Sequence, residues 1–132
     1  MGPAFLTLAE VMEIHQDQIC RYGGSLGVRD AGLLQSAVAM PAAAFSGKYL
    51  HSDLHEMAAA YLFHLVQNHP FVDGNKRVGA VAAAVFLAVN DLELRASEDD
   101  YEQLVMSVAR GEIGKSTVAE FFRVNVPGHP NR

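Results

Sequence analysis

The chain has 132 residues, of which 50% are hydrophobic and 19% are charged. This length suits one domain, and this composition excludes a disordered or fibrous chain. The formal net charge of −5 disfavours direct binding to nucleic acid, and the single cysteine, Cys20, excludes an intramolecular disulfide and fits a reducing intracellular compartment.

The longest apolar run covers residues 78–89, which is too short to span a bilayer. The N-terminus has no charged segment followed by a hydrophobic segment, so no secretory signal is expected. We therefore expect a cytoplasmic protein without membrane contact. One domain would cover residues 1–132, with its core at 6–126 and a frayed tail at 127–132.

The first third of the chain predicts two helices. Thr7 and Glu10 form a capping-box pattern ahead of an apolar stripe, and the turn at residues 21–24 ends that helix. Asp30 is placed to cap a second helix, which should end before Pro41 because proline disfavours helix in the preceding residue.

Residues 41–52 show no clear pattern and are predicted to form a long loop. Asp53 and Glu56 then resemble a cap, and the third helix should run to about Asn68. A fourth helix at about residues 75–90 is apolar on all sides, which predicts a helix buried all round at the centre of the domain.

Two further helices complete the predicted fold. Ser97 should begin the fifth, which ends near residues 110–111, and Thr117 with Glu120 should begin the sixth. The sequence thus predicts a compact all-α bundle of about six helices with a central buried helix.

One stretch, on the turn that enters the fourth helix, combines an imidazole, a carboxylate, an amide and two cations. It reads His69, Pro70, Phe71, Val72, Asp73, Gly74, Asn75, Lys76, Arg77. Helix N-termini present unpaired N–H groups and partial positive charge, and Gly74 lets a phosphate approach the backbone. Lys76 and Arg77 oppose the helix dipole there, and a bound polyphosphate would explain their position.

The same stretch carries residues suited to phosphate-group transfer. Asp73 is a natural Mg²⁺ ligand, because Mg²⁺ favours one or two carboxylates together with substrate phosphates. His69 has a side chain suited to proton abstraction near neutral pH. The alternative is an ordinary turn followed by solvated cations, and spacing alone leaves both interpretations open.

Residues 69–77 resemble the signature of the Fic/Doc family, His-Pro-Phe-x-Asp/Glu-Gly-Asn-Gly/Lys-Arg. The turn at residues 21–24 and the helix at 30–41 resemble the death-on-curing (Doc) toxin branch of that family, and the likeness covers about residues 6–126. The resemblance implies an all-helical fold with the motif between two central antiparallel helices. It also implies that Phe71 packs into the core and fixes the loop.

By the same resemblance, His69 would deprotonate a target hydroxyl, Asp73 would hold Mg²⁺ and Arg77 would bind a nucleotide phosphate. The anion-binding nest would consist of Gly74, Asn75 and Lys76. The nucleotide would be ATP.

Lys76 separates two reaction types within the family. Family members that transfer AMP mostly have glycine at this position, whereas Doc-like toxins have lysine and transfer the γ-phosphate, with translation elongation factor Tu as the target. Gly74 and Pro70 instead match the AMP-transferring enzymes. We expect an ATP-dependent protein kinase that blocks translation, with AMP transfer and a catalytically silent protein-binding module as alternatives.

Regulation is expected to come from another protein. Inhibited Fic enzymes carry Ser/Thr-x-x-x-Glu-Gly/Asn, and the nearest matches, which begin at Ser52 and Ser116, lack the final residue. In the Doc branch the inhibitor is a Phd-like antitoxin. A zinc site on the i, i+4 pair His51 and His55 is the weaker alternative for metal binding, because His64 lies farther along the third helix and no third ligand stands at motif spacing.

Overall fold

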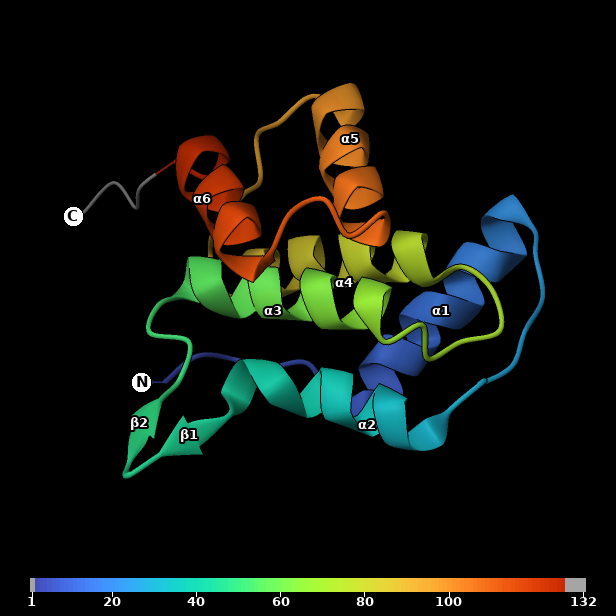
Figure 1. Cartoon of the computed structure of the whole chain (residues 1–132), viewed down its shortest axis with the longest axis horizontal. Coiled ribbons are helices and arrows are strands. Elements are labelled where there is room, and N and C mark those ends of the chain that lie inside the picture. The colour runs from blue at the N-terminus through green and yellow to red at the C-terminus, as the bar shows by residue number, and fades with distance from the viewer. Residues whose placement is uncertain (1, 128–132) are drawn as a thin grey trace.

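A computed structural model describes residues 2–127, which form six α-helices and one small hairpin (Figure 1). The helices are α1 (Leu8–Tyr22), α2 (Ala31–Ala39), α3 (Leu54–Gln67), α4 (Asn75–Val89), α5 (Glu98–Ala109) and α6 (Lys115–Asn125). A single 3-10 turn, Met40–Ala42, follows α2, and strands β1 (Ala44–Phe45) and β2 (Lys48–Tyr49) pair antiparallel. The predicted all-α fold is confirmed, while residues 128–132 of the expected tail lie outside the described residues.

Side-chain caps begin four of the helices as the sequence predicts. Thr7 Oγ1 accepts from the Glu10 N–H at 3.1 Å, and Glu10 Oε1 accepts from the Thr7 N–H at 2.8 Å. Asp30, Asp53 and Ser97 each accept a hydrogen bond from the backbone N–H three residues further on. Each cap stabilises its helix by about 1 kcal/mol.

The start of α6 differs from the prediction. The helix begins at Lys115, and its N-cap, Gly114, makes no side-chain hydrogen bond. The Val118 N–H already bonds to the Gly114 carbonyl at 3.3 Å, so Thr117 lies inside the first turn rather than before it. A backbone-only cap leaves no side-chain pattern in the sequence, which is why Thr117 was the wrong residue.

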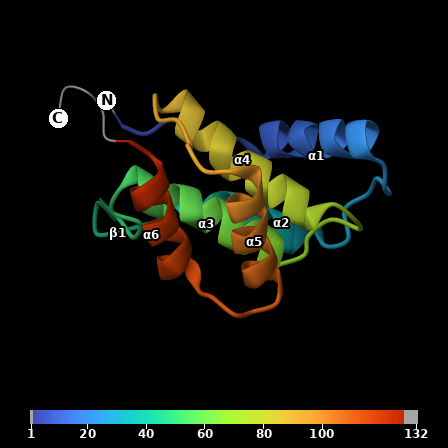
Figure 2. The ribbon, with the colours of Figure 1, turned by 90° about the horizontal axis from the view of Figure 1, so that it is seen from above.

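Helices α3 and α4 lie antiparallel at the centre, as Figures 1 and 2 show. Helix α2 packs against α3 and α1 against α4, while α5 and α6 cover the opposite side of the pair. The close approach of α3 and α4 depends on Gly79, where a Cβ would lie 2.7 Å from Val66 Cγ2 and 3.1 Å from the Leu62 carbonyl oxygen. The short loop between the two helices therefore lies next to this close contact, which joins Val66 near the end of α3 to Gly79 near the start of α4.

Helix α4 is not buried on all sides, contrary to the prediction. Its inner face is buried through Val78, Ala82 and Phe86, but Ala88 and Val89 near its end are exposed, Val89 by 50%. Small apolar residues such as Val81, Ala84 and Val85 make the helix apolar all round although these positions are only half-buried. Among residues 2–127, no helix combines the length and apolar character needed to cross a membrane.

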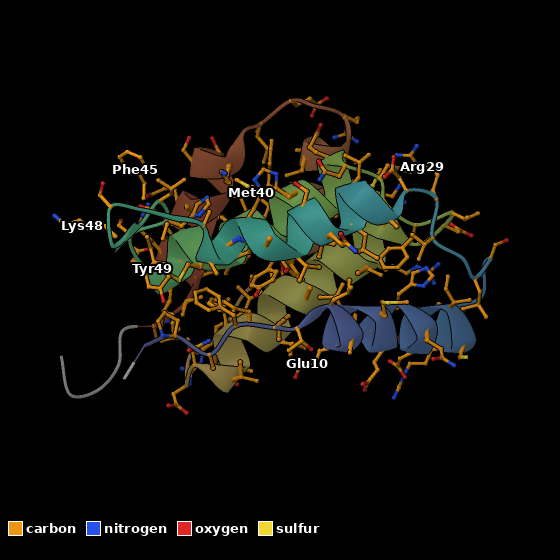
Figure 3. The ribbon with its side chains drawn as sticks, turned by 90° about the horizontal axis from the view of Figure 1, so that it is seen from below. Glu10, Arg29, Met40, Phe45, Lys48 and Tyr49 are labelled. Carbon is orange, nitrogen blue, oxygen red and sulfur yellow. The ribbon has the colours of Figure 1, made fainter. Side chains whose placement is uncertain are left out.

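The predicted loop at residues 41–52 contains the hairpin. Ala44 pairs with Tyr49 and Phe45 with Lys48, and the two residues between the strands, Ser46 and Gly47, both have positive φ angles of 52° and 78°. Two such residues are typical of the type I′ turn. Figure 3 places this hairpin at the far end of the molecule from Arg29, which lies where the chain enters α2.

Candidate active site

The nine-residue motif forms the loop between α3 and α4, at the end of the molecule opposite the hairpin (Figure 1). All six residues predicted for the site line one pocket of about 470 Å³: His69, Asp73, Gly74, Asn75, Lys76 and Arg77. Val66 from α3 and Ala109 at the end of α5 add apolar side chains to the wall of the pocket. The structure therefore brings the six predicted residues together in one pocket, and α5 adds a residue from a distant part of the chain.

Two backbone conformations shape this loop. Gly74 is the N-cap of α4 with φ of 79°, in the left-handed region that favours glycine. His69 also has a positive φ, 50°, which is uncommon for a residue with a side chain and costs about 1 kcal/mol. A conformation of this kind persists only where surrounding contacts hold it.

Asn75 holds the loop closed. Its buried side chain accepts from the Phe71 N–H at 2.9 Å and donates to the Phe71 carbonyl at 3.0 Å. Phe71 itself is buried in the core, as the family resemblance implied. Because its side chain is used in this way, Asn75 would serve an anion through its backbone N–H.

The carboxylate of Asp73 is exposed and held by backbone donors. Oδ2 accepts from the Ser25 N–H at 3.1 Å, and Oδ1 accepts from the Gly74 N–H at 2.8 Å. These two hydrogen bonds keep the pKa of Asp73 below its ordinary value, so the side chain is ionised at neutral pH. Gly24 makes this possible, because a Cβ there would lie 2.6 Å from Asp73 Oδ2.

The first turn of α4 presents positive charge to the pocket. Backbone N–H groups in the first turn of a helix have no acceptor within the helix. Lys76, in the same turn, is exposed and lines the pocket. Arg77 is half-buried and donates to the carbonyls of Gln18 at 3.3 Å and Gly23 at 3.0 Å. It thus ties α4 to the end of α1 while still lining the pocket.

Sequence reasoning missed the loop before α2, which covers the motif. The Val72 N–H donates to the Gly27 carbonyl at 3.0 Å, and Val28 forms an isolated antiparallel bridge with Phe71. His15, on α1, donates through Nε2 to the Asp73 carbonyl at 2.9 Å. The only signal in the sequence was the run of glycines at 23, 24 and 27, which indicated a turn but not what the turn contacts.

The weaker metal-site alternative has no support in the described residues, where no group of three or more His, Cys, Asp or Glu side chains is arranged to hold a metal ion. His51 is 7% exposed, and His64 receives a hydrogen bond from Lys115 Nζ at 3.0 Å. Burial first, and then the charge of Lys115, lowers the pKa of His64 to about 4. His51 is therefore buried and His64 half-buried, and burial also lowers the pKa of His51.

The two partial inhibitory motifs, which begin at Ser52 and Ser116, end at Glu56 and Glu120, and neither glutamate lines the pocket. Glu56 and Glu120 both pair with Arg123 on α6, with oxygen–nitrogen distances of 2.9 Å and 3.5 Å. The hydrogen bonds of Arg77 go to main-chain carbonyls of α1 and of the turn after it. In the part of the chain that the structure describes, neither glutamate reaches the pocket arginine.

Comparison with known proteins agrees with the motif. Residues 5–87 match the model of the Fic/DOC family. The chain is 42% identical over 100 residues to Toxin Doc of Mycolicibacterium smegmatis, covering 74% of this chain and 77% of that protein. It is 32% identical over 114 residues to Protein kinase doc of Escherichia phage P1, covering 86% and 89%.

Proposed function

Because this chain belongs to the Fic/Doc family, we propose that it is a Doc-like toxin that transfers the γ-phosphate of ATP to a hydroxyl group of a target protein. The observation that carries this proposal is the pocket, where an imidazole, a carboxylate and two cations surround one helix N-terminus. The names of the two relatives, a toxin and a protein kinase, favour the same activity.

In the proposed reaction, His69 takes the proton from the target hydroxyl as its oxygen attacks the γ-phosphorus of ATP. The bond from that phosphorus to the β,γ-bridging oxygen breaks, and ADP leaves. The free N–H groups at the start of α4, together with Lys76 and Arg77, would hold the phosphates and offset their charge.

The donor set of Asp73 fits Mg²⁺. Its carboxylate is exposed and ionised, and each oxygen accepts only one hydrogen bond from the protein, which leaves lone pairs for a cation. One carboxylate is enough where substrate phosphates and water complete the octahedron. Bound there, Mg²⁺ would neutralise charge that develops on the phosphates.

AMP transfer is the second candidate, and Lys76 is the residue that distinguishes it. The lysine places a side chain and a charge at the entrance to the anion site, where AMP-transferring relatives mostly have glycine. Gly74, with its left-handed conformation, matches those relatives instead. We give Lys76 more weight because it changes both volume and charge beside the phosphates.

Target and inhibitor complete the proposal. By resemblance, the acceptor is translation elongation factor Tu, and the inhibitor is a Phd-like antitoxin encoded separately. The contacts of Glu56 and Glu120 support control by another protein. Both glutamates pair with Arg123, whereas Arg77 of the motif bonds to main-chain carbonyls.

Incubation with ATP labelled at either the α or the γ position tests the function, with bacterial lysate as the acceptor. We expect protein to become labelled from γ-labelled ATP only, and His69→Ala to lose about 10²–10⁴-fold in rate while remaining folded. Label from α-labelled ATP would establish AMP transfer. Absence of label from both, with folded wild-type protein, would favour the binding module.

A further inference from the structure

The side chain of Arg29 holds the backbone at the catalytic histidine. Its Nε donates to the His69 carbonyl at 2.6 Å, and its Nη2 donates to the Asn68 carbonyl at 3.0 Å. Both carbonyls lie just past the last turn of α3, where carbonyls lack partners within the helix. The planar guanidinium suits two neighbouring acceptors, and a cation here also complements the helix dipole.

Backbone groups of the same segment extend this contact. The N–H groups of Arg29 and Asp30 both donate to the Pro70 carbonyl, at 2.7 Å and 3.0 Å. Three successive carbonyls, at residues 68, 69 and 70, are therefore held by residues 29–30. Figure 3 shows Arg29 at the start of α2, away from the hairpin.

His69 needs this support because its φ of 50° is unfavourable for a residue with a side chain. The direction in which the imidazole leaves the backbone depends on φ, so relaxation to a commoner conformation would turn the ring away from its present position. Reaction geometry tolerates little error, and a misplacement of about 1 Å costs roughly 10²-fold in rate.

We propose that Arg29 is a positioning residue that acts through the backbone of His69. Arg29 is not among the residues that line the pocket, and its guanidinium is engaged by the carbonyls of Asn68 and His69. Its guanidinium fixes the left-handed conformation of His69 and thereby directs the imidazole into the pocket. The inference rests on the proposed function, in which His69 is the base.

Kinetics of group transfer from ATP supply the first test. Arg29→Ala should lower kcat by about 10- to 100-fold without raising the KM for ATP. Arg29→Lys should give an intermediate rate, because an ammonium group can donate to one carbonyl but lacks the planar pair of N–H donors that bonds to both. The control is Arg95→Ala, which removes an exposed arginine paired with Glu93 and should keep wild-type kinetics.

An NMR measurement tests the positioning role of Arg29 independently of the activity. In protein with labelled histidine, the Cε1–H NMR signal of His69, assigned with His69→Asn, should shift in Arg29→Ala, while the signal of His51 should not. If wild type transfers no group from ATP, the proposed function fails, and the NMR result still decides the role of Arg29. An unchanged His69 signal, or a kcat that falls only with the folded fraction, would overturn the positioning role.

Discussion

The imidazole of His15 lies parallel to the ring of Phe71, with centroids 3.9 Å apart and planes at 6°. The same imidazole donates a hydrogen bond to the Asp73 carbonyl. One buried side chain on α1 therefore contacts two positions of the loop between α3 and α4, the ring of Phe71 and the carbonyl of Asp73. Because the two contacts join segments more than fifty residues apart, they couple the stability of the core to the geometry of the pocket.

Replacing His15 tests this coupling. His15→Leu keeps a side chain of similar size but loses the hydrogen bond and the ring stacking, which should lower the free energy of unfolding by about 1–3 kcal/mol. Urea denaturation measures the change. Met12→Leu, on the exposed side of the same helix, is the control and should unfold like wild type; equal stability of both variants would show that the His15 contacts contribute nothing.

A second prediction concerns the packing of α3 against α4. Gly79→Ala should destabilise the fold by about 1–3 kcal/mol, because the added methyl group meets Val66 and the backbone of Leu62. At Gly32 in α2, a Cβ has its nearest contact at 3.4 Å, so Gly32→Ala should stabilise by up to about 1 kcal/mol. Thermal unfolding of both variants checks the pair, and a more stable Gly79→Ala would contradict the close approach.

Acid sensitivity follows from His64. Its pKa in the folded protein is about 4, against an ordinary value of 6.5, so the unfolded chain binds more protons between these pH values. The free energy of unfolding should therefore fall as pH decreases from 6.5 to about 4. His64→Gln should flatten this part of the curve, measured by urea unfolding across the range; an identical slope would mean that His64 is not buried as a neutral group.

Lys76 is the residue that we propose distinguishes γ-phosphate transfer from AMP transfer. Lys76→Gly should weaken γ-phosphate transfer by about 10²-fold, because a cation beside the phosphates is removed. It should also open the space that AMP-transferring relatives keep, so some AMP transfer is expected. Initial rates with both labelled forms of ATP measure the change. Undiminished γ-phosphate transfer in this variant would show that Lys76 does not determine the reaction type.

The sequence predicted the helices well where local chemistry sets them. Thr7, Asp30, Asp53 and Ser97 are caps whose side chains act within three residues, so their pattern is visible in the sequence. The start of α6 was missed because Gly114 caps through its backbone alone. The hairpin was missed because its strands are two residues each, too short to show alternation.

The polar lining of the pocket was predictable for a similar reason, since one contiguous motif supplies it. The residues that hold the motif were not. Ser25 and Arg29 reach it across more than thirty-five residues of chain, and His15 comes from a different helix. No periodicity or spacing links such positions, because only the packing of α1 and of the loop before α2 brings them to the pocket.

The mass of the acceptor protein, after reaction with wild type and unlabelled ATP, tests γ-phosphate transfer most directly. The acceptor is the lysate protein that takes up label, and His69→Ala provides the blank. We expect a gain of one phosphoryl group per modified site, absent from the blank. A gain of one AMP, or an equal gain with His69→Ala, would contradict γ-phosphate transfer with His69 as the base.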